Sequence, residues 1–216
     1  MTHSEENYLK IIFHLGRGGS QEVNTNAIAE QMDTKPSSVT DMVRKLADKE
    51  LLYYKKYQGV RLTELGKSKA LSIVRKHRLW EVFLVEKLHF SWDEVHEVAE
   101  QLEHINSEKL IDKLDWLLEY PKYDPHGDPI PDKNGNVKDR DRQLLSEVAV
   151  HKEGICVGVK DSSTTFLQFL DRHNIALGQH IKVLEREAFD GSLLLQISNR
   201  DVRISYQIAS NLYLKI

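Results

Sequence analysis

Apolar residues recur at helical spacing through the first part of the chain. One apolar stripe predicts a helix over 4–15 with Ser4 as its cap. Two further stripes predict helices over 27–32 and 36–50, joined by a short connector. The segment 51–63 changes texture, because Leu, Tyr and Val flank a Gln-Gly turn, and this pattern is typical of a β-hairpin.

The second part of the chain first continues the helical pattern and then abandons it. Three more stripes predict helices over 64–88, 91–105 and 107–120. From Pro121 the chain contains four prolines in a short stretch together with glycines, which predicts a loop or linker. After it, β-branched residues alternate with polar ones, so we expect a small all-β module with one short helix inserted at 162–173.

A helix, a short turn, a helix that starts with small polar residues, and a basic hairpin together predict a winged helix-turn-helix domain. Short hydroxyl side chains at the start of the third helix can reach base edges, and basic side chains suit phosphates. The candidate DNA-binding residues are Thr25, Lys35, Ser37, Ser38, Thr40, Asp41, Arg44, Lys55, Lys56 and Arg61. One such domain touches few base pairs, so a dimer is expected.

Charge is distributed unevenly, and this favours DNA binding over an ordinary charged surface on a three-helix domain. Residues 1–78 carry 14 Lys/Arg and 9 Asp/Glu, a net charge of +5. Residues 79–153 carry 9 Lys/Arg and 18 Asp/Glu, a net charge of −9. A polyanion suits the first segment and a cation suits the second.

The acidic segment contains VHEVAEQLEH, in which four polar side chains share one helix face. At about 100° per residue, His96, Glu100, Glu103 and His104 fall within an arc of roughly 100°. Either a solvated surface or half of a metal site explains such a face, and the stretch alone favours the solvated surface.

A second stretch shifts the balance toward a metal site. RKHRLWE places His77 and Glu81 four residues apart on the preceding helix, and the short loop between the two helices suggests that they pack antiparallel. Imidazole and carboxylate ligands suit Mn²⁺, Fe²⁺, Co²⁺ or Zn²⁺. The single Cys156 argues against a soft metal site and excludes an intrachain disulfide.

Composition excludes a membrane protein. The chain is 40% hydrophobic and 29% charged, and no run approaches the ~18 apolar residues of a membrane span. The N-terminal stretch has no basic leader followed by an apolar core, so a cytoplasmic location is expected.

The ordered motifs PSSVTDMVRKL, RKHRLWE, VHEVAEQLEH and HGDPIP resemble the DtxR/MntR family of metal-dependent transcriptional repressors, over nearly the whole chain. The resemblance implies an α+β fold, mainly α, in three parts. These are a winged helix-turn-helix DNA-binding domain (1–73), a helical metal-binding and dimerisation domain (74–143, with the linker from about 121), and an SH3-like β domain (144–216).

The resemblance also implies metal-site roles. His77, Glu81 and His96 match the family's ancillary site, whereas Glu100, Glu103 and His104 match its primary site. Asn7 stands where the first helix supplies a fourth primary ligand. Manganese-type members have a Glu where this chain has Lys10, so their two-metal arrangement is not expected here. Glu100 stands where iron-type members have Cys, which favours Mn²⁺.

We therefore expect a homodimeric repressor that binds a double-stranded operator when loaded with Mn²⁺ or Fe²⁺ and controls metal homeostasis genes. Co²⁺, Ni²⁺ or Zn²⁺ are expected to substitute in vitro. No enzymatic activity, membrane partner or small organic substrate is expected. A hydrolytic metalloenzyme and a winged-helix regulator not controlled by metal are the alternatives.

Overall fold

The computed structural model covers the chain and describes residues 1–55, 58–138 and 140–216. These residues form two compact units. The first unit consists of residues 1–80, 100–112 and 131–136, and the second of residues 81–99, 113–130 and 137–216. Among the described residues, no helix is long and apolar enough to cross a membrane.

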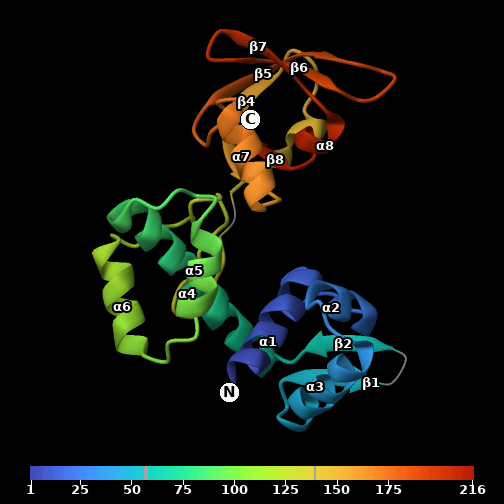
Figure 1. The fold of residues 1–216 in the computed structure, drawn as a ribbon, viewed down its shortest axis with the longest axis vertical. Helices are drawn as coiled ribbons and strands as arrows, with labels where there is room; N and C mark the ends of the chain where they lie inside the picture. The colour runs from blue at the N-terminus through green and yellow to red at the C-terminus, as the bar shows by residue number, and fades with distance from the viewer. Residues whose placement is uncertain (56–57, 139) are drawn as a thin grey trace. The chain divides into compact units, whose positions relative to one another are not determined.

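The first unit begins with three helices and a hairpin, so the predicted winged helix-turn-helix is confirmed. Its elements are α1 (His3–Leu15), α2 (Thr25–Gln31), α3 (Pro36–Asp48), β1 (Leu52–Lys55), β2 (Gly59–Leu62) and the first part of α4 (Glu64–Leu88). Figure 1 shows α1 and α2 in blue, with the antiparallel β1–β2 pair beside them. The stripe residues Ile12, Ile28, Val43 and Leu46 are buried together with apolar residues of the hairpin.

The cap of α1 differs from the prediction. Thr2, not Ser4, caps the helix, which starts at His3. The Thr2 hydroxyl accepts a hydrogen bond from the Glu5 amide at 3.3 Å, and the Glu5 carboxylate accepts one from the Thr2 amide at 3.1 Å. Since this reciprocal pair satisfies two backbone donors, Thr2 forms a better cap than Ser4.

The predicted helix over 91–105 is too long at both ends, since α5 runs only from Val95 to Leu102. At its start, the Ser91 hydroxyl lies 2.6 Å from the Glu94 carboxylate, but residues 92–94 form a turn instead of a helix. At its end, Glu103 and His104 lie in a turn beyond the helix. The next helix, α6, runs from Glu108 to Leu117, and the Ser107 hydroxyl accepts from the Leu110 amide at its start.

The C-terminal part of the second unit is the predicted β module. Its strands are β3 (Gln143–Leu144), β4 (Glu153–Val159), β5 (His180–Arg186), β6 (Leu193–Ile197), β7 (Arg200–Ile204) and β8 (Leu212–Lys215). They pair in the order β3-β8-β4-β5-β6-β7, and α7 (Thr164–Arg172) packs against the sheet through Leu167 and Leu170 (Figure 1). The 3₁₀ turn Leu145–Glu147 and the short helix α8 (Tyr206–Ala209) were not predicted.

The predicted linker is an ordered part of the second unit up to residue 130. The Asp124 carboxylate accepts hydrogen bonds from the amides of His126 and Asp128, both at 2.9 Å. The Val159 amide of β4 donates to the His126 carbonyl at 2.9 Å. This segment therefore packs along β4 and connects the helical residues of the unit to its sheet.

Candidate metal centre and DNA-binding face

The turn after α5 carries a carboxylate that is completely buried. Glu103 has 0% exposure, and both of its carboxylate oxygens lie 2.7 Å from the Lys10 ammonium of α1. One of them also lies 2.7 Å from Nδ1 of His77 on α4. Burial alone would raise the pKa of Glu103, but hydrogen bonding to His77 and the charge of Lys10 hold it below its usual value. The lowered pKa favours the charged carboxylate, and its two oxygens pair with the Lys10 ammonium.

His104 follows Glu103 and is held by a second carboxylate of α1. Its Nδ1 lies 2.6 Å from Glu6, which is itself buried, and its Nε2 lies 4.0 Å from the Glu103 carboxylate. When Glu6 accepts the Nδ1 proton, Nε2 keeps a free lone pair, which is the arrangement that supports a metal-binding histidine. His104 also stacks on His3 at a ring-centroid distance of 4.3 Å.

Asn7 supplies an unsatisfied oxygen on the same helix. Its side-chain Oδ1 is buried and has no hydrogen-bond partner among the described residues. A buried polar atom without a partner lowers the stability of the fold by about 1–3 kcal/mol. A bound ligand that accepts electron density from this oxygen would remove that cost. A divalent cation is such a ligand.

Ligand atoms of His77, Glu100 and Glu103 lie within 4.8 Å of one another. With His104 and Asn7 they offer oxygen and imidazole ligands, the set that suits Mn²⁺ and Fe²⁺. The residues present therefore fit a metal of this class. The five were predicted as metal ligands, although His77 was assigned to the ancillary group. That they bind metal stays a prediction, whereas the expectation of a solvated face does not hold for the buried Glu103 and His104.

A second group of ligand-type residues lies in the second unit. Nδ1 of His96 is 3.5 Å from the Glu81 carboxylate, and that these two residues form part of an ancillary metal site stays a prediction. Glu81 also lies 3.7 Å from Nδ1 of His126, and Asp124 joins them within 4.8 Å. The contribution of His77 to this centre stays a prediction. Outside this group, the Asp161 carboxylate accepts a hydrogen bond from the Ser163 amide at 2.8 Å, just before α7 begins.

His126 lies in a turn of the predicted linker, yet its side chain is buried. The side chain is 4% exposed, and its Nε2 lies 2.8 Å from the Trp92 carbonyl. Burial alone would lower the pKa of His126, but the Glu81 carboxylate, helped by Asp124 and the Trp92 carbonyl, raises it to about 9. Its position in a proline-rich segment gave no signal of this burial, since Glu81 is distant in sequence.

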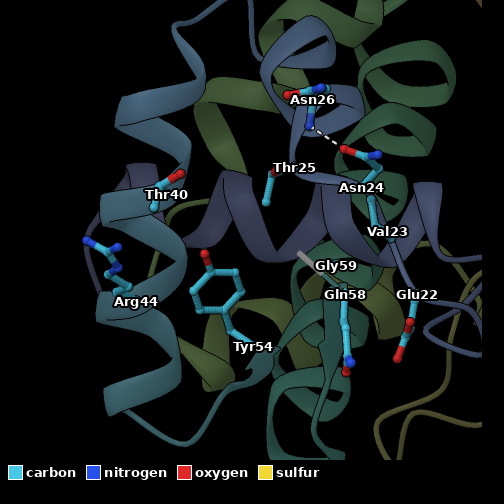
Figure 2. Close-up of a pocket in the computed structure, with 10 residues that line it drawn as sticks. All are labelled: Glu22, Val23, Asn24, Thr25, Asn26, Thr40, Arg44, Tyr54, Gln58 and Gly59. Atoms are coloured by element: carbon cyan, nitrogen blue, oxygen red, sulfur yellow. Dashed lines mark hydrogen bonds between the residues drawn. The ribbon is translucent and has the colours of Figure 1, made fainter. Parts of the chain in front are cut away.

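The predicted DNA-binding residues gather on the helix-turn-helix and the hairpin of the first unit. Figure 2 shows Thr25 of α2, Thr40 and Arg44 of α3, and Tyr54 of β1 lining one open groove. Ser37, Ser38 and Asp41 are exposed on α3, and Lys35, Lys55 and Arg61 are exposed beside them on the same domain. The Thr40 hydroxyl donates to the Pro36 carbonyl at 3.0 Å. Lys56 lies outside the described residues.

One contact of α1 was missed by the sequence analysis, and it links α1 to α3. The Glu5 side chain is buried and lies 3.0 Å from Lys45 and 2.7 Å from Lys49. Hydrogen bonding to Lys49 is the main reason that the pKa of Glu5 falls to about 2, with Lys45 adding to it against the effect of burial. Because α1 also carries Glu6, Asn7 and Lys10, one helix joins the candidate metal centre to α3.

This link predicts a pH-dependent contribution to stability. The folded-state pKa of Glu5 is depressed, so its contribution is complete above pH 5 and is lost as the pH falls toward about 2. We expect Glu5→Gln to lower the free energy of unfolding at pH 7 by on the order of 1 kcal/mol, since water screens the half-exposed lysines. Urea unfolding followed by circular dichroism at pH 7, 5 and 3 measures it.

The matched control is Glu30→Gln on α2, where the side chain is exposed. We expect that change to leave stability within about 0.5 kcal/mol at every pH. If the loss of unfolding free energy in Glu5→Gln did not shrink between pH 5 and pH 3, charge pairing would not be the cause of that loss.

These features define a class of protein, namely a winged-helix protein whose α1 adjoins a buried carboxylate and imidazole centre. Three family models match the chain: "Iron dependent repressor, N-terminal DNA binding domain" over residues 1–60, "Iron dependent repressor, metal binding and dimerisation domain" over 63–132, and "FeoA domain" over 143–216. The chain belongs to the iron-dependent repressor family, which confirms the resemblance seen in its motifs.

Individual relatives agree with this assignment. The iron-dependent repressor IdeR of Mycobacterium tuberculosis is 34% identical over 131 residues, which are 61% of this chain and 56% of that protein. The chain thus spans little more than half the length of this relative. The transcriptional regulator MntR of Oceanobacillus iheyensis is 36% identical over 143 residues, 66% of this chain and 95% of that protein.

Solved structures match over nearly the full length. A manganese-dependent transcriptional repressor in complex with manganese has a TM-score of 0.88 at 32% identity and covers 97% of this chain and 98% of its own. ScaR with bound Zn²⁺ has a TM-score of 0.81 at 34% identity and covers 98% of each chain. Both matches therefore include the β module after residue 143.

Proposed function

We propose that the chain is a homodimeric transcriptional repressor that binds operator DNA when loaded with Mn²⁺ or Fe²⁺ and controls metal homeostasis genes. The observation that carries the proposal is the unsatisfied Oδ1 of Asn7 on α1, the helix that also holds His104 through Glu6. Relatives named as iron- and manganese-dependent repressors support the choice of metals. We place the three domains at 1–73, 74–143 and 144–216.

In this proposal Asn7, Glu100, Glu103 and His104 hold the primary ion, and His77, Glu81 and His96 belong to the ancillary centre. A bound ion would supply positive charge to the primary ligands, which come from α1, α5 and the turn after α5. Glu6 fixes the tautomer of His104, and Glu5 connects α1 to Lys45 of α3 and to Lys49, the residue that follows α3. A metal that restrains α1 thereby restrains α3, and by linkage DNA must tighten metal binding by the same factor.

DNA binding is assigned to α3 and the hairpin. Ser37, Ser38 and Asp41 are exposed and short enough to reach base edges, whereas Arg44, Lys55 and Arg61 suit phosphates. Two copies are needed to read two half-sites. The exposed apolar residues Trp116 and Tyr120, at 61% and 55% exposure, support a dimer surface at the end of α6.

The test is DNA binding as a function of metal. A library of random duplexes is first selected with the full chain in Mn²⁺, and the selected duplex is then titrated in Mn²⁺, in Mg²⁺ and with a chelator. We expect Mn²⁺ to tighten binding by about 50-fold or more over the chelated chain, within the usual range of allosteric coupling. Mg²⁺ serves as the control divalent cation. It gives up its bound water molecules reluctantly, so we expect it to tighten DNA binding less than Mn²⁺ does. Equal affinity in Mn²⁺ and chelator would refute metal control.

A further inference from the structure

The Lys10 ammonium occupies the centre of the predicted ligand cluster. Its nitrogen lies 2.5 Å from Glu100 and 2.7 Å from each carboxylate oxygen of Glu103. Lys10 itself is only 7% exposed. An ammonium group has three donors, and these three contacts account for all of them. Lys10 is thus a buried cation whose partners are two of the residues expected to bind metal.

A divalent ion and this ammonium cannot share Glu103 without repulsion. Both Glu103 oxygens face Lys10, and one also faces His77, so every oxygen of this carboxylate already has a donor. An ion bound to either oxygen would lie within a few ångströms of the ammonium. Glu103 has 0% exposure, so little water is present to screen two positive charges.

We propose that Lys10 is an internal cation that competes with the divalent metal for Glu103 and Glu100, and so sets the metal concentration at which the protein responds. This inference rests on the proposed function. Metal entry displaces the Lys10 ammonium from Glu103, and loss of metal allows its return. Lys10 lies on α1, and Glu5 of the same helix pairs with Lys45 and Lys49. Replacing the Lys10 contact with a metal contact therefore changes how α1 is restrained, and α1 adjoins α3.

The first test is Mn²⁺ binding to the full chain without DNA, measured by isothermal titration calorimetry. Lys10→Met keeps a long flexible side chain and removes the charge. We expect it to bind Mn²⁺ at least about 10-fold more tightly than the wild type. Lys109→Met is the matched control, because it removes the same charge from an exposed position of the same unit. We expect that control to change affinity by less than about 2-fold, since exposed charges are screened.

The second test separates competition from a merely structural role. In thermal unfolding, Lys10→Met is expected to lower the melting temperature of the metal-free chain, since Glu100 and Glu103 lose their counterion. At saturating Mn²⁺ this deficit should disappear, because the wild type no longer benefits from Lys10 there. If Lys10 merely positions the ligands, the deficit persists or grows with metal.

Two outcomes are decisive and distinguishable. Wild-type binding of Mn²⁺ combined with equal or weaker binding by Lys10→Met overturns the competition alone. A wild-type chain that does not bind Mn²⁺ overturns both the proposed function and the competition.

Discussion

Glu103→Gln is expected to weaken Mn²⁺ binding by about 100-fold or more and to abolish metal-dependent operator binding. Glutamine has almost the same shape but no charge, so the site keeps its packing and loses its most buried anion. The amide also presents a donor where the carboxylate accepted from His77 and Lys10. Loss of a metal ligand lowers metal affinity by more than the 10- to 100-fold that is typical for residues that only orient ligands. Calorimetry with Mn²⁺ and titration of the selected duplex measure both effects.

Glu97→Gln is the matched control, since Glu97 is an exposed glutamate on the same helix region. We expect it to bind Mn²⁺ and DNA like the wild type. Circular dichroism must show that Glu103→Gln is folded, because the change leaves Lys10 with a weaker partner. A folded Glu103→Gln chain with wild-type Mn²⁺ affinity would remove Glu103 from the metal centre.

The pattern of the sequence was sufficient for the DNA-binding part because its determinants are local. Pro36 at the first turn of α3 and the stripe of Val39, Val43 and Leu46 specify a helix without reference to distant residues. The hairpin is likewise specified by its turn and its alternation. The differences lie at helix ends: Thr2 rather than Ser4 caps α1, and the predicted bounds of α2 and α3 differ from the observed ones by one or two residues.

The buried polar groups could not be predicted in the same way. Helical periodicity assigns Glu103 and His104 to the polar face of a helix, yet α5 ends before them. The buried Glu103 pairs with Lys10, 93 residues away, and His104 contacts Glu6, 98 residues away. In the local pattern Glu5 and Glu6 looked like acidic residues that favour a helix N-terminus. Only the fold brings these partners together.

Gly127→Ala is expected to lower the stability of the second unit by about 3 kcal/mol or more, which is a fall of roughly 6–12 °C in melting temperature. Gly127 has a φ of +88°, and an added Cβ would lie 2.1 Å from the Val157 carbonyl oxygen and 2.5 Å from the Gly158 Cα. Both neighbours are backbone atoms of β4, so relief requires the linker to move away from the sheet. Differential scanning calorimetry of the full chain measures the change.

Gly178→Ala isolates the clash from the backbone strain. Gly178 has a φ of +86°, but an added Cβ would meet nothing within 4 Å. We therefore expect a loss of only about 1 kcal/mol there, the strain of a left-handed alanine. Equal losses at the two positions would show that the linker does not depend on close packing against β4. If Gly127→Ala has the larger effect, it should also disturb the adjacent His126, which lies 3.7 Å from Glu81. The ancillary centre would then depend on the fit of the linker against the C-terminal sheet.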